Sequence, residues 1–269
     1  MSKTMSKIMS TEQILVRIEN GIATIALNNP PLNVVTLTLT RELGEALDAL
    51  AADDAVRAVI VTGSGDKAFC AGSDIGEFPD LMAPGQVVPK KLGPQNDIFN
   101  RLDRFPKPTI AAINGLAFGG GVEIAMCCDL IVVSEDSRLC LPEIKLGVFP
   151  SSGGTVRVTR RIGEGRAKEM MFLGEPVDAA TALAWGLVNR IAPRGQALAV
   201  AHALAATLVQ RPRGALALCK SIIDLSFDLP LEQVIAHSLQ ASDRAFSSKE
   251  CAEGVRAFFA KETPRFTDI

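Results

Sequence analysis

Three consecutive glycines precede a glutamate in the middle of the chain, at Gly119-Gly120-Gly121-Val122-Glu123. A glycine inside a helix costs roughly 1 kcal/mol relative to alanine, so three glycines at a helix start indicate that something requires bare backbone there. The free N–H groups and partial positive charge of a helix N-terminus suit a developing oxyanion. Glu123 shares a helix face with Gly120, and its side chain leans towards the N-terminus. We therefore expect a carboxylate at an anion-binding turn; close helix packing with a solvated glutamate is the alternative.

The same glycines do not fit a nucleotide-binding loop. No Lys-Ser or Lys-Thr pair follows them, and a GxGxxG pattern is absent. Both a phosphate loop and a dinucleotide fingerprint are therefore excluded.

A second glutamate, Glu143, stands between Pro142 and the apolar Ile144, with Leu139 and Leu141 nearby. Apolar neighbours that displace water raise the pKa of a carboxyl group and suit it to donate a proton. Locally, a helix-start charge after a proline is an equally good interpretation. The residues alone leave both open.

Residues 68–75, AFCAGSDI, predict a strand that runs into a turn of small residues. Such a turn lets another molecule approach the backbone, and its N–H groups can point at an oxygen. A plain left-handed turn is the alternative. Ser73 is not expected to be a nucleophile, because a GxSxG motif requires glycines where Ala71 and Ile75 stand.

The composition leaves proton transfer to carboxylates. The chain has no tyrosine and only two histidines, His202 and His237, both in helix-like patterns of the C-terminal third. A histidine-based triad and a histidine-rich metal site are therefore poorly supplied, and we expect no metal.

Charge and cysteine usage bound the partners and the compartment. The 28 basic and 30 acidic residues give a net charge of −2, so we expect no nucleic acid or membrane partner. None of the six cysteines forms a CxxC pair, which indicates reduced thiols and a cytoplasmic protein. No run reaches the roughly 18 apolar residues of a membrane span.

These chemical groups need a scaffold of alternating strands and helices. The predicted strands are two within 14–28, then 58–61, 68–72, 109–113 and 129–133, and the predicted helices are 36–52, 97–104 and one starting at 119. Repeated strand-strand-helix units of about 40–50 residues predict an α/β fold with a layered spiral. Residues 76–96, with four prolines and three glycines, predict a long loop.

Beyond residue 152 the pattern becomes mostly helical. The predicted elements there are a strand at 187–191 and helices at 163–173, 178–184, 196–209, 213–226, 231–245 and 248–261. Their apolar faces predict burial against a partner subunit or against the rest of this chain.

Several motifs resemble the enoyl-CoA hydratase/isomerase (crotonase) family. Residues 110–130, IAAINGLAFGGGVEIAMCCDL, resemble its signature segment, and residues 68–75 its A-F-x-A-G-x-D-I turn. Residues 142–155 resemble its P-E-x-x-L-G-x-x-P-x-x-G-G-T stretch, and residues 182–189 its A-x-x-x-G-L-V-N element. The motifs follow the family order over roughly residues 12–262. The resemblance implies a crotonase-like spiral with a C-terminal helical region.

The resemblance also implies an active site. In that family two backbone N–H groups form an oxyanion hole, and they match Ser73 and Gly120. Members that hydrate double bonds carry two glutamates, which match Glu123 and Glu143, whereas members that only isomerise usually lose the first. An enoyl-CoA hydratase acting on a trans-2-enoyl-CoA is therefore implied, with no cofactor beyond the coenzyme A of the substrate. Glu123 would deprotonate the water that attacks Cβ, and Glu143 would supply a proton to Cα.

The thioester is expected to contact further residues of these turns and of the tail. Many relatives carry a lysine just after the A-G-x-D-I turn, where Gly76 stands in this chain. Lys67, just before the turn, is expected to take part in holding the nucleotide instead. Ordinary packing or solvation is the alternative for Lys67 and for the tail residues. The set expected to bind substrate or coenzyme A is Lys67, Ala71, Gly72, Asp74, Ile75, Phe78, Leu81, Met82, Gly119, Phe258, Phe259 and Lys261.

We divide the chain into a disordered tail (1–11), a spiral core with the thioester site (12–200) and a helical region for oligomerisation and coenzyme A cover (201–269). The resemblance implies a homotrimer or a dimer of trimers. Two alternatives remain: isomerase, dehydratase or decarboxylase chemistry on a specialised acyl-CoA, and an RNA-binding or scaffold protein on the same fold. The two glutamates and the lack of a basic patch argue against the latter.

Overall fold

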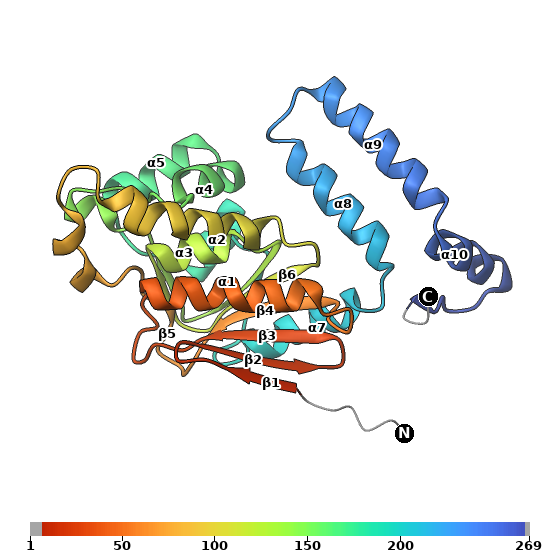
Figure 1. The fold of residues 1–269 in the computed structure, drawn as a ribbon, viewed down its shortest axis with the longest axis horizontal. Coiled ribbons are helices and arrows are strands. Elements are labelled where there is room, and N and C mark those ends of the chain that lie inside the picture. Colours follow the sequence, from red (N-terminus) through yellow and green to blue (C-terminus); the bar gives the residue numbers. More distant parts are fainter. Residues whose placement is uncertain (1–6, 267–269) are drawn as a thin grey trace.

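The computed structural model describes residues 7–266, which form a spiral around two sheets (Figure 1). Seven strands make the larger sheet and four the smaller one. In pairing order the larger sheet contains β1 (Lys7–Ser10), β2 (Ile14–Glu19), β3 (Ile22–Leu27), β4 (Ala58–Gly63), β6 (Thr109–Ile113), β8 (Leu130–Ser134) and β11 (Arg190–Ala192). The smaller sheet contains β10 (Val177–Asp178), β9 (Arg138–Cys140), β7 (Leu116–Phe118) and β5 (Ala68–Cys70).

The strand order explains the spiral. From β3 to β11 the larger sheet is parallel, and β5, β7 and β9 are parallel in the smaller one. The consecutive pairs β4–β5, β6–β7 and β8–β9 each give one strand to each sheet before the chain turns into a helix or helical turn. The predicted α/β spiral of strand-strand-helix units is therefore confirmed.

Helices cover both sides of the larger sheet. The α-helices within residues 7–266 are α1 (Leu37–Ala52), α2 (Gly93–Asp103), α3 (Gly120–Met126), α4 (Gly154–Ile162), α5 (Glu164–Leu173), α6 (Ala179–Trp185), α7 (Ala197–Leu208), α8 (Arg213–Leu225), α9 (Leu231–Phe246) and α10 (Lys249–Ala260). One apolar cluster joins α1, α2 and α3 to the sheet, and a second lies beneath α7 on the opposite face. Because β4 and β6 are buried on both faces, they are almost entirely apolar.

Helix α1 begins two residues after Val35, which forms an isolated bridge with Ser73. The Thr36 hydroxyl caps it by accepting from the Leu39 N–H at 3.0 Å. Leu39, Leu43 and Leu47 then form the buried stripe that the sequence predicts. The cap thus fixes the start of α1 next to Val35, the residue that precedes Thr36.

The prediction of a long loop at residues 76–96 is largely wrong. This segment contains the 3-10 turns η1 (Ile75–Glu77) and η2 (Pro79–Leu81) and the π-turn η3 (Val88–Leu92), and α2 already begins at Gly93. The prolines do not oppose these helical turns, since Pro94 stands in the first turn of α2, where its missing N–H costs nothing.

Two predicted boundaries also differ from the structure. Residues 7–10, assigned to a disordered tail, form β1 and pair antiparallel with β2. This edge strand is held by backbone hydrogen bonds to β2, and its four residues contain no pattern that predicts this pairing. Residues 1–6 and 267–269 lie outside the described residues. The boundary at residue 200 falls inside α7, which packs on the sheet.

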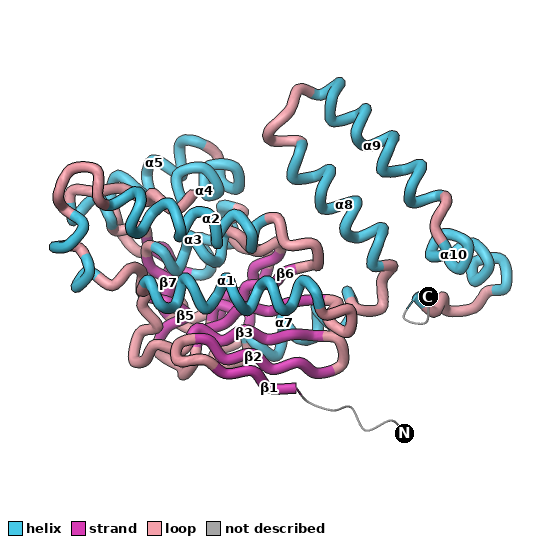
Figure 2. Tube along the Cα trace, in the orientation of Figure 1, coloured by secondary structure: helices cyan, strands magenta, loops and turns pink. Residues whose placement is uncertain are grey.

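Helices α8, α9 and α10 extend away from the sheets (Figure 2). Ion pairs join α8 and its C-terminal loop to the core: Lys220 with Asp129 at 2.9 Å, Arg213 with Asp54 at 2.8 Å and Asp228 with Arg160 at 2.5 Å. Within residues 7–266, no helix is both long enough and apolar enough to cross a membrane.

Candidate active site

The first element of the site is the turn after β5. The Val35 N–H donates to the Gly72 carbonyl at 2.8 Å, and the Asp74 N–H donates to the Val35 carbonyl at 2.9 Å. Val35 and Ser73 thus form a parallel bridge. Because Val35 bonds to the residues on either side of Ser73, the Ser73 N–H points to the opposite side.

A second N–H belongs to Gly120, the first residue of α3. The N–H of a first helical residue has no acceptor within its own helix. A Cβ atom added to Gly120 would lie 3.8 Å from the Ser73 nitrogen. The two N–H groups predicted to form the oxyanion hole are therefore neighbours.

The structure requires glycine at Gly121 and at Gly119 for different steric reasons. A Cβ on Gly121 would lie 2.1 Å from the Cys70 carbonyl oxygen, so α3 packs directly against the backbone of β5. Gly119 has a φ of 49° and lies where a Cβ would approach the Glu143 Oε1 to 3.0 Å. The two interpretations of the triplet, close packing and a bare anion-binding turn, thus apply to different members of it.

Glu123 lies inside the molecule, with only 3% of its surface exposed. Its Oε1 accepts from the Ser152 N–H at 2.7 Å and from the Gly154 N–H at 3.0 Å. Burial raises the pKa of Glu123, while these two N–H groups and the nearby Arg157 charge oppose the rise. The alternative of a solvated glutamate is therefore wrong.

Arg157, on α4, holds the loop that fixes Glu123. Its guanidinium donates to the Ser152 carbonyl at 3.3 Å and to the Asn100 Oδ1 at 2.6 Å, and pairs with Asp103 at 3.2 Å. The loop before α4 is thereby joined to α2. No local pattern in the sequence indicates this role, because Arg157 and Asn100 lie more than 50 residues apart in the chain.

Glu143 opens the 3-10 turn η4 (Glu143–Leu146) directly after Pro142. Burial and then the charge of Glu123 raise the pKa of Glu143 to about 7, while a backbone N–H of its own residue opposes the rise. Its Oε2 is buried and makes no hydrogen bond within residues 7–266. Both interpretations of Glu143 hold, since it starts a helical turn and is also partly desolvated.

The other residues expected near the thioester fall into two groups. Ala71, Gly72 and Gly119 belong to the two turns that carry the Ser73 and Gly120 N–H groups. The Asp74 carboxylate instead caps η1 by accepting from the Gly76 N–H at 2.9 Å. Ile75 is half exposed, Phe78 is partly buried and Leu81 is buried. Met82 is 80% exposed, so the described chain does not place it in an apolar wall.

Lys67 and the tail residues lie on the surface of this chain. Lys67 is exposed, and its carbonyl accepts from the Leu116 N–H at 3.1 Å. Phe258 and Phe259 are 77% and 79% exposed and, with Lys261, lie at α10, far from α3 in Figure 1. Contact of Phe258, Phe259 and Lys261 with coenzyme A stays a prediction, and it would require the active site of a second chain. Contact of Lys67 with coenzyme A also stays a prediction.

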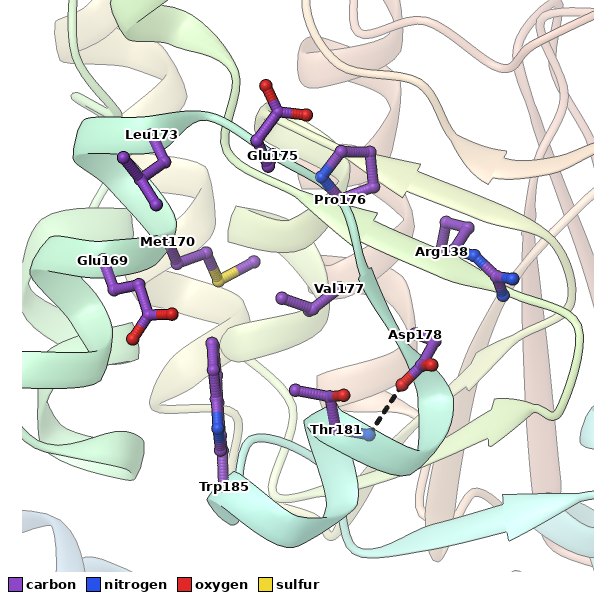
Figure 3. Close-up of a pocket in the computed structure, with 10 residues that line it drawn as sticks. All are labelled: Arg138, Glu169, Met170, Leu173, Glu175, Pro176, Val177, Asp178, Thr181 and Trp185. Atoms are coloured by element: carbon purple, nitrogen blue, oxygen red, sulfur yellow. Dashed lines mark hydrogen bonds between the residues drawn. The ribbon is translucent and has the colours of Figure 1, made fainter.

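A separate hollow of about 340 Å³ lies between α5, β10 and α6 (Figure 3). Trp185, Met170 and Val177 face it, with Glu169 and Asp178 at its rim. The Asp178 carboxylate already caps α6 by accepting from the Thr181 N–H at 2.8 Å. This hollow contains none of the residues predicted for the site, and we assign the chemistry to the glutamate pair. Residues 7–266 contain no group of three His, Cys, Asp or Glu side chains that could hold a metal ion.

Comparison with known proteins agrees with this geometry. The sequence profile of the enoyl-CoA hydratase/isomerase family matches residues 17–269. The chain belongs to this family. The resemblance and the crotonase-type fold are both confirmed.

Individual family members cover nearly the whole chain. A short-chain-enoyl-CoA hydratase from Clostridium acetobutylicum is 33% identical, with 94% of this chain and 97% of that protein covered. A crotonyl-CoA hydratase from Syntrophomonas wolfei is 31% identical, with 96% and 99% covered. A crystal structure of an enoyl-CoA hydratase from Bacillus anthracis superposes with a TM-score of 0.89 at 32% identity, covering 95% of this chain and 100% of that one.

Proposed function

We propose that this family member is an enoyl-CoA hydratase that adds water across the 2,3 double bond of a trans-2-enoyl-CoA. The observation that carries the proposal is the glutamate pair beside two free N–H groups. One carboxylate is oriented by two backbone donors, and the other has a pKa of about 7 and an oxygen without a partner in the described chain. The relatives named as hydratases support the same reaction.

The Ser73 and Gly120 N–H groups would bind the thioester carbonyl oxygen. As water adds to Cβ, negative charge moves onto this oxygen, and both N–H groups would stabilise it. Removing one donor of this kind typically costs on the order of 3 kcal/mol of transition-state stabilisation. Tests on Ser73 must alter the backbone conformation, since its side chain is not the donor.

The two glutamates would divide the proton transfers. Burial raises the pKa of Glu123, and Ser152, Gly154 and Arg157 oppose that rise. In its ionised form, Glu123 would take a proton from the attacking water. Glu143 has no comparable donor from residues 7–266 at its buried Oε2, so it is the member that carries a proton and delivers it to Cα. Repulsion between the two charges favours one ionised carboxylate at a time.

We further propose a homotrimer or dimer of trimers in which α8, α9 and α10 contact neighbouring chains. The exposed apolar side chains of these helices support this, because a monomer would leave them in water. Phe258, Phe259 and Lys261 would then cover the coenzyme A of a neighbouring site. The six free thiols support a reducing, cytoplasmic compartment.

A panel of enoyl-CoA thioesters tests the reaction. We expect crotonyl-CoA and longer trans-2-enoyl-CoAs to lose the absorbance of the conjugated double bond as the 3-hydroxyacyl-CoA forms. Movement of the double bond without uptake of water would instead assign isomerisation. No reaction with any straight, branched or aromatic thioester would contradict the proposal.

A further inference from the structure

Lys91, on the π-turn η3, is a buried lysine whose charge is balanced by Glu77 on η1. Its side chain is only 3% exposed, and its Nζ donates to the Glu77 Oε2 at 2.6 Å. Within residues 7–266, no other group bonds to this ammonium group or pairs with it. Taking two charges out of water costs about as much as their attraction returns, so a buried ion pair is a weak source of stability. The geometry that the pair fixes therefore explains it better than the free energy of folding does.

The other carboxylate oxygen of Glu77 holds the first residue of α1. The Leu37 N–H donates to the Glu77 Oε1 at 3.1 Å. An N–H at the start of a helix has no acceptor within that helix, and the positive end of the helix favours a carboxylate. Helix α1 has no acidic residue in its own first turn. Glu77 supplies this charge from 40 residues away, and Lys91 holds Glu77 in place.

The backbone held by Glu77 is the backbone that positions Ser73. Val35, two residues before Leu37, is hydrogen-bonded to the residues on either side of Ser73. On the other segment, η1 begins two residues after Ser73 and ends at Glu77. The two segments are therefore joined at two points, at the bridge to Ser73 and at the hydrogen bond from Leu37 to Glu77.

We propose that Glu77 and Lys91 are positioning residues that hold the Ser73 N–H in the direction required by the thioester oxygen. This inference rests on the proposed hydratase site and adds two residues that act on it only through the backbone of Ser73. When the ion pair is broken, one of the two points that join the segments is weakened, and the turn that carries Ser73 gains freedom. Because a shift of about 1 Å at a group that acts on the transition state can cost roughly 100-fold in rate, a small gain in freedom lowers kcat.

The variant Lys91→Met tests the proposal, because methionine retains an unbranched apolar chain and lacks the charge. We expect kcat for crotonyl-CoA hydration to fall about tenfold while KM changes less than about twofold, since the oxyanion hole acts mainly on the transition state. Glu45→Gln is the matched control, because it breaks the exposed ion pair between Arg41 and Glu45 on α1. We expect it to leave both constants unchanged. An unchanged kcat in Lys91→Met, or a loss that lies in KM alone, would overturn the proposal.

The double variant Glu77→Gln/Lys91→Met keeps the test valid where Glu77→Gln alone fails to fold around an unpaired buried ammonium group. Two residues that act as one unit give non-additive losses. We therefore expect kcat of the double variant to match that of Lys91→Met. A further fall that equals the loss from an independent second site would contradict the proposal.

The carbonyl stretch of bound butyryl-CoA tests whether the pair acts through the oxyanion hole. This thioester has no double bond to hydrate, so its carbonyl reports hydrogen bonding without turnover. In isotope-edited infrared difference spectra at saturating ligand, we expect the stretch to move to lower frequency in the wild-type protein and by a smaller amount in Lys91→Met. An equal shift in both proteins would assign the pair a purely structural role and reject the proposal.

The outcomes also separate this inference from the function on which it rests. Hydration by Lys91→Met at the wild-type kcat rejects the positioning role and retains the hydratase. Absence of hydration by the wild-type protein rejects the hydratase, and the infrared difference between the two proteins still decides the positioning role.

Discussion

Glu123 and Glu143 are the same residue type in different surroundings. Glu123 has two backbone N–H groups on one oxygen, whereas Glu143 has a buried oxygen without a partner in residues 7–266 and a pKa of about 7. Pairs of carboxyl groups with separated protonation preferences can serve as base and acid in one site. At the scale of single residues, these different surroundings support the proposed division of roles.

The pKa of Glu143 predicts the pH dependence of kcat. A pKa raised to about 7 keeps the proton on Glu143 at lower pH, so its donating form is lost as pH rises through that value. We expect kcat to fall about tenfold per pH unit on the alkaline side. Steady-state rates across the pH range test this, with Glu143→Gln as the control that should lack this limb. A kcat independent of pH through neutrality would contradict the assignment.

Both glutamates are identifiable from the sequence, but the groups that orient them are not. The glycine triplet points to Glu123, and the resemblance to the crotonase family points to Glu143. The hydrogen bonds from Ser152 and Gly154 to Glu123 join residues about 30 positions apart, and no local pattern encodes such a contact.

At the scale of elements, the start of α4 determines the position of Glu123. A Cβ on Gly154 would lie 2.9 Å from the Glu123 Oε1 and 2.8 Å from the Pro150 side chain. We expect Gly154→Ala to lower kcat about 10–100-fold, because a shift of about 1 Å at a catalytic group has an effect of that size. Rate measurements on the folded variant test this.

Gly165, in α5, is the matched control. A Cβ there would meet nothing within 4 Å of the described chain, and its backbone is helical. We expect Gly165→Ala to keep full activity and to gain about 0.5–1 kcal/mol in the free energy of unfolding. Equal loss of activity in both variants would show that α4 has no special role.

Elements with strong periodicity are predictable, and those set by distant partners are not. The buried leucine stripe and Thr36 cap of α1 follow from local chemistry, and the prediction of 36–52 is close to Leu37–Ala52. The loop predicted at 76–96 is wrong because glycine and proline do not always break a helix, and Pro94 suits the first turn of α2. Strand β1 depends on its pairing with β2, which its own four residues do not encode.

At the scale of the whole molecule, the C-terminal helices present a large apolar surface. The exposed apolar residues of this region are Ile223, Phe227, Leu231, Ile235, Leu239, Phe246, Val255, Phe258 and Phe259. Large exposed apolar patches of this kind mark protein interfaces. The structure thus supports an assembly, whereas no periodicity in the sequence could distinguish docking within the chain from docking on a partner.

Mass measurement in solution tests the assembly. We expect light scattering to give three or six times the 28.5 kDa of one chain. Leu239→Asp, at a residue 67% exposed on α9, should lower the mass, while Glu232→Asp on the same helix should not. A monomeric wild-type protein at micromolar concentration would contradict the proposed trimer.

The central claim is that two glutamates share the proton transfers of hydration, and single amide substitutions test it most directly. We predict that Glu123→Gln and Glu143→Gln each lower kcat for crotonyl-CoA hydration by about 10²–10⁴-fold, with folding and oligomeric mass unchanged. Near-full hydratase activity in either variant would contradict the two-carboxylate account.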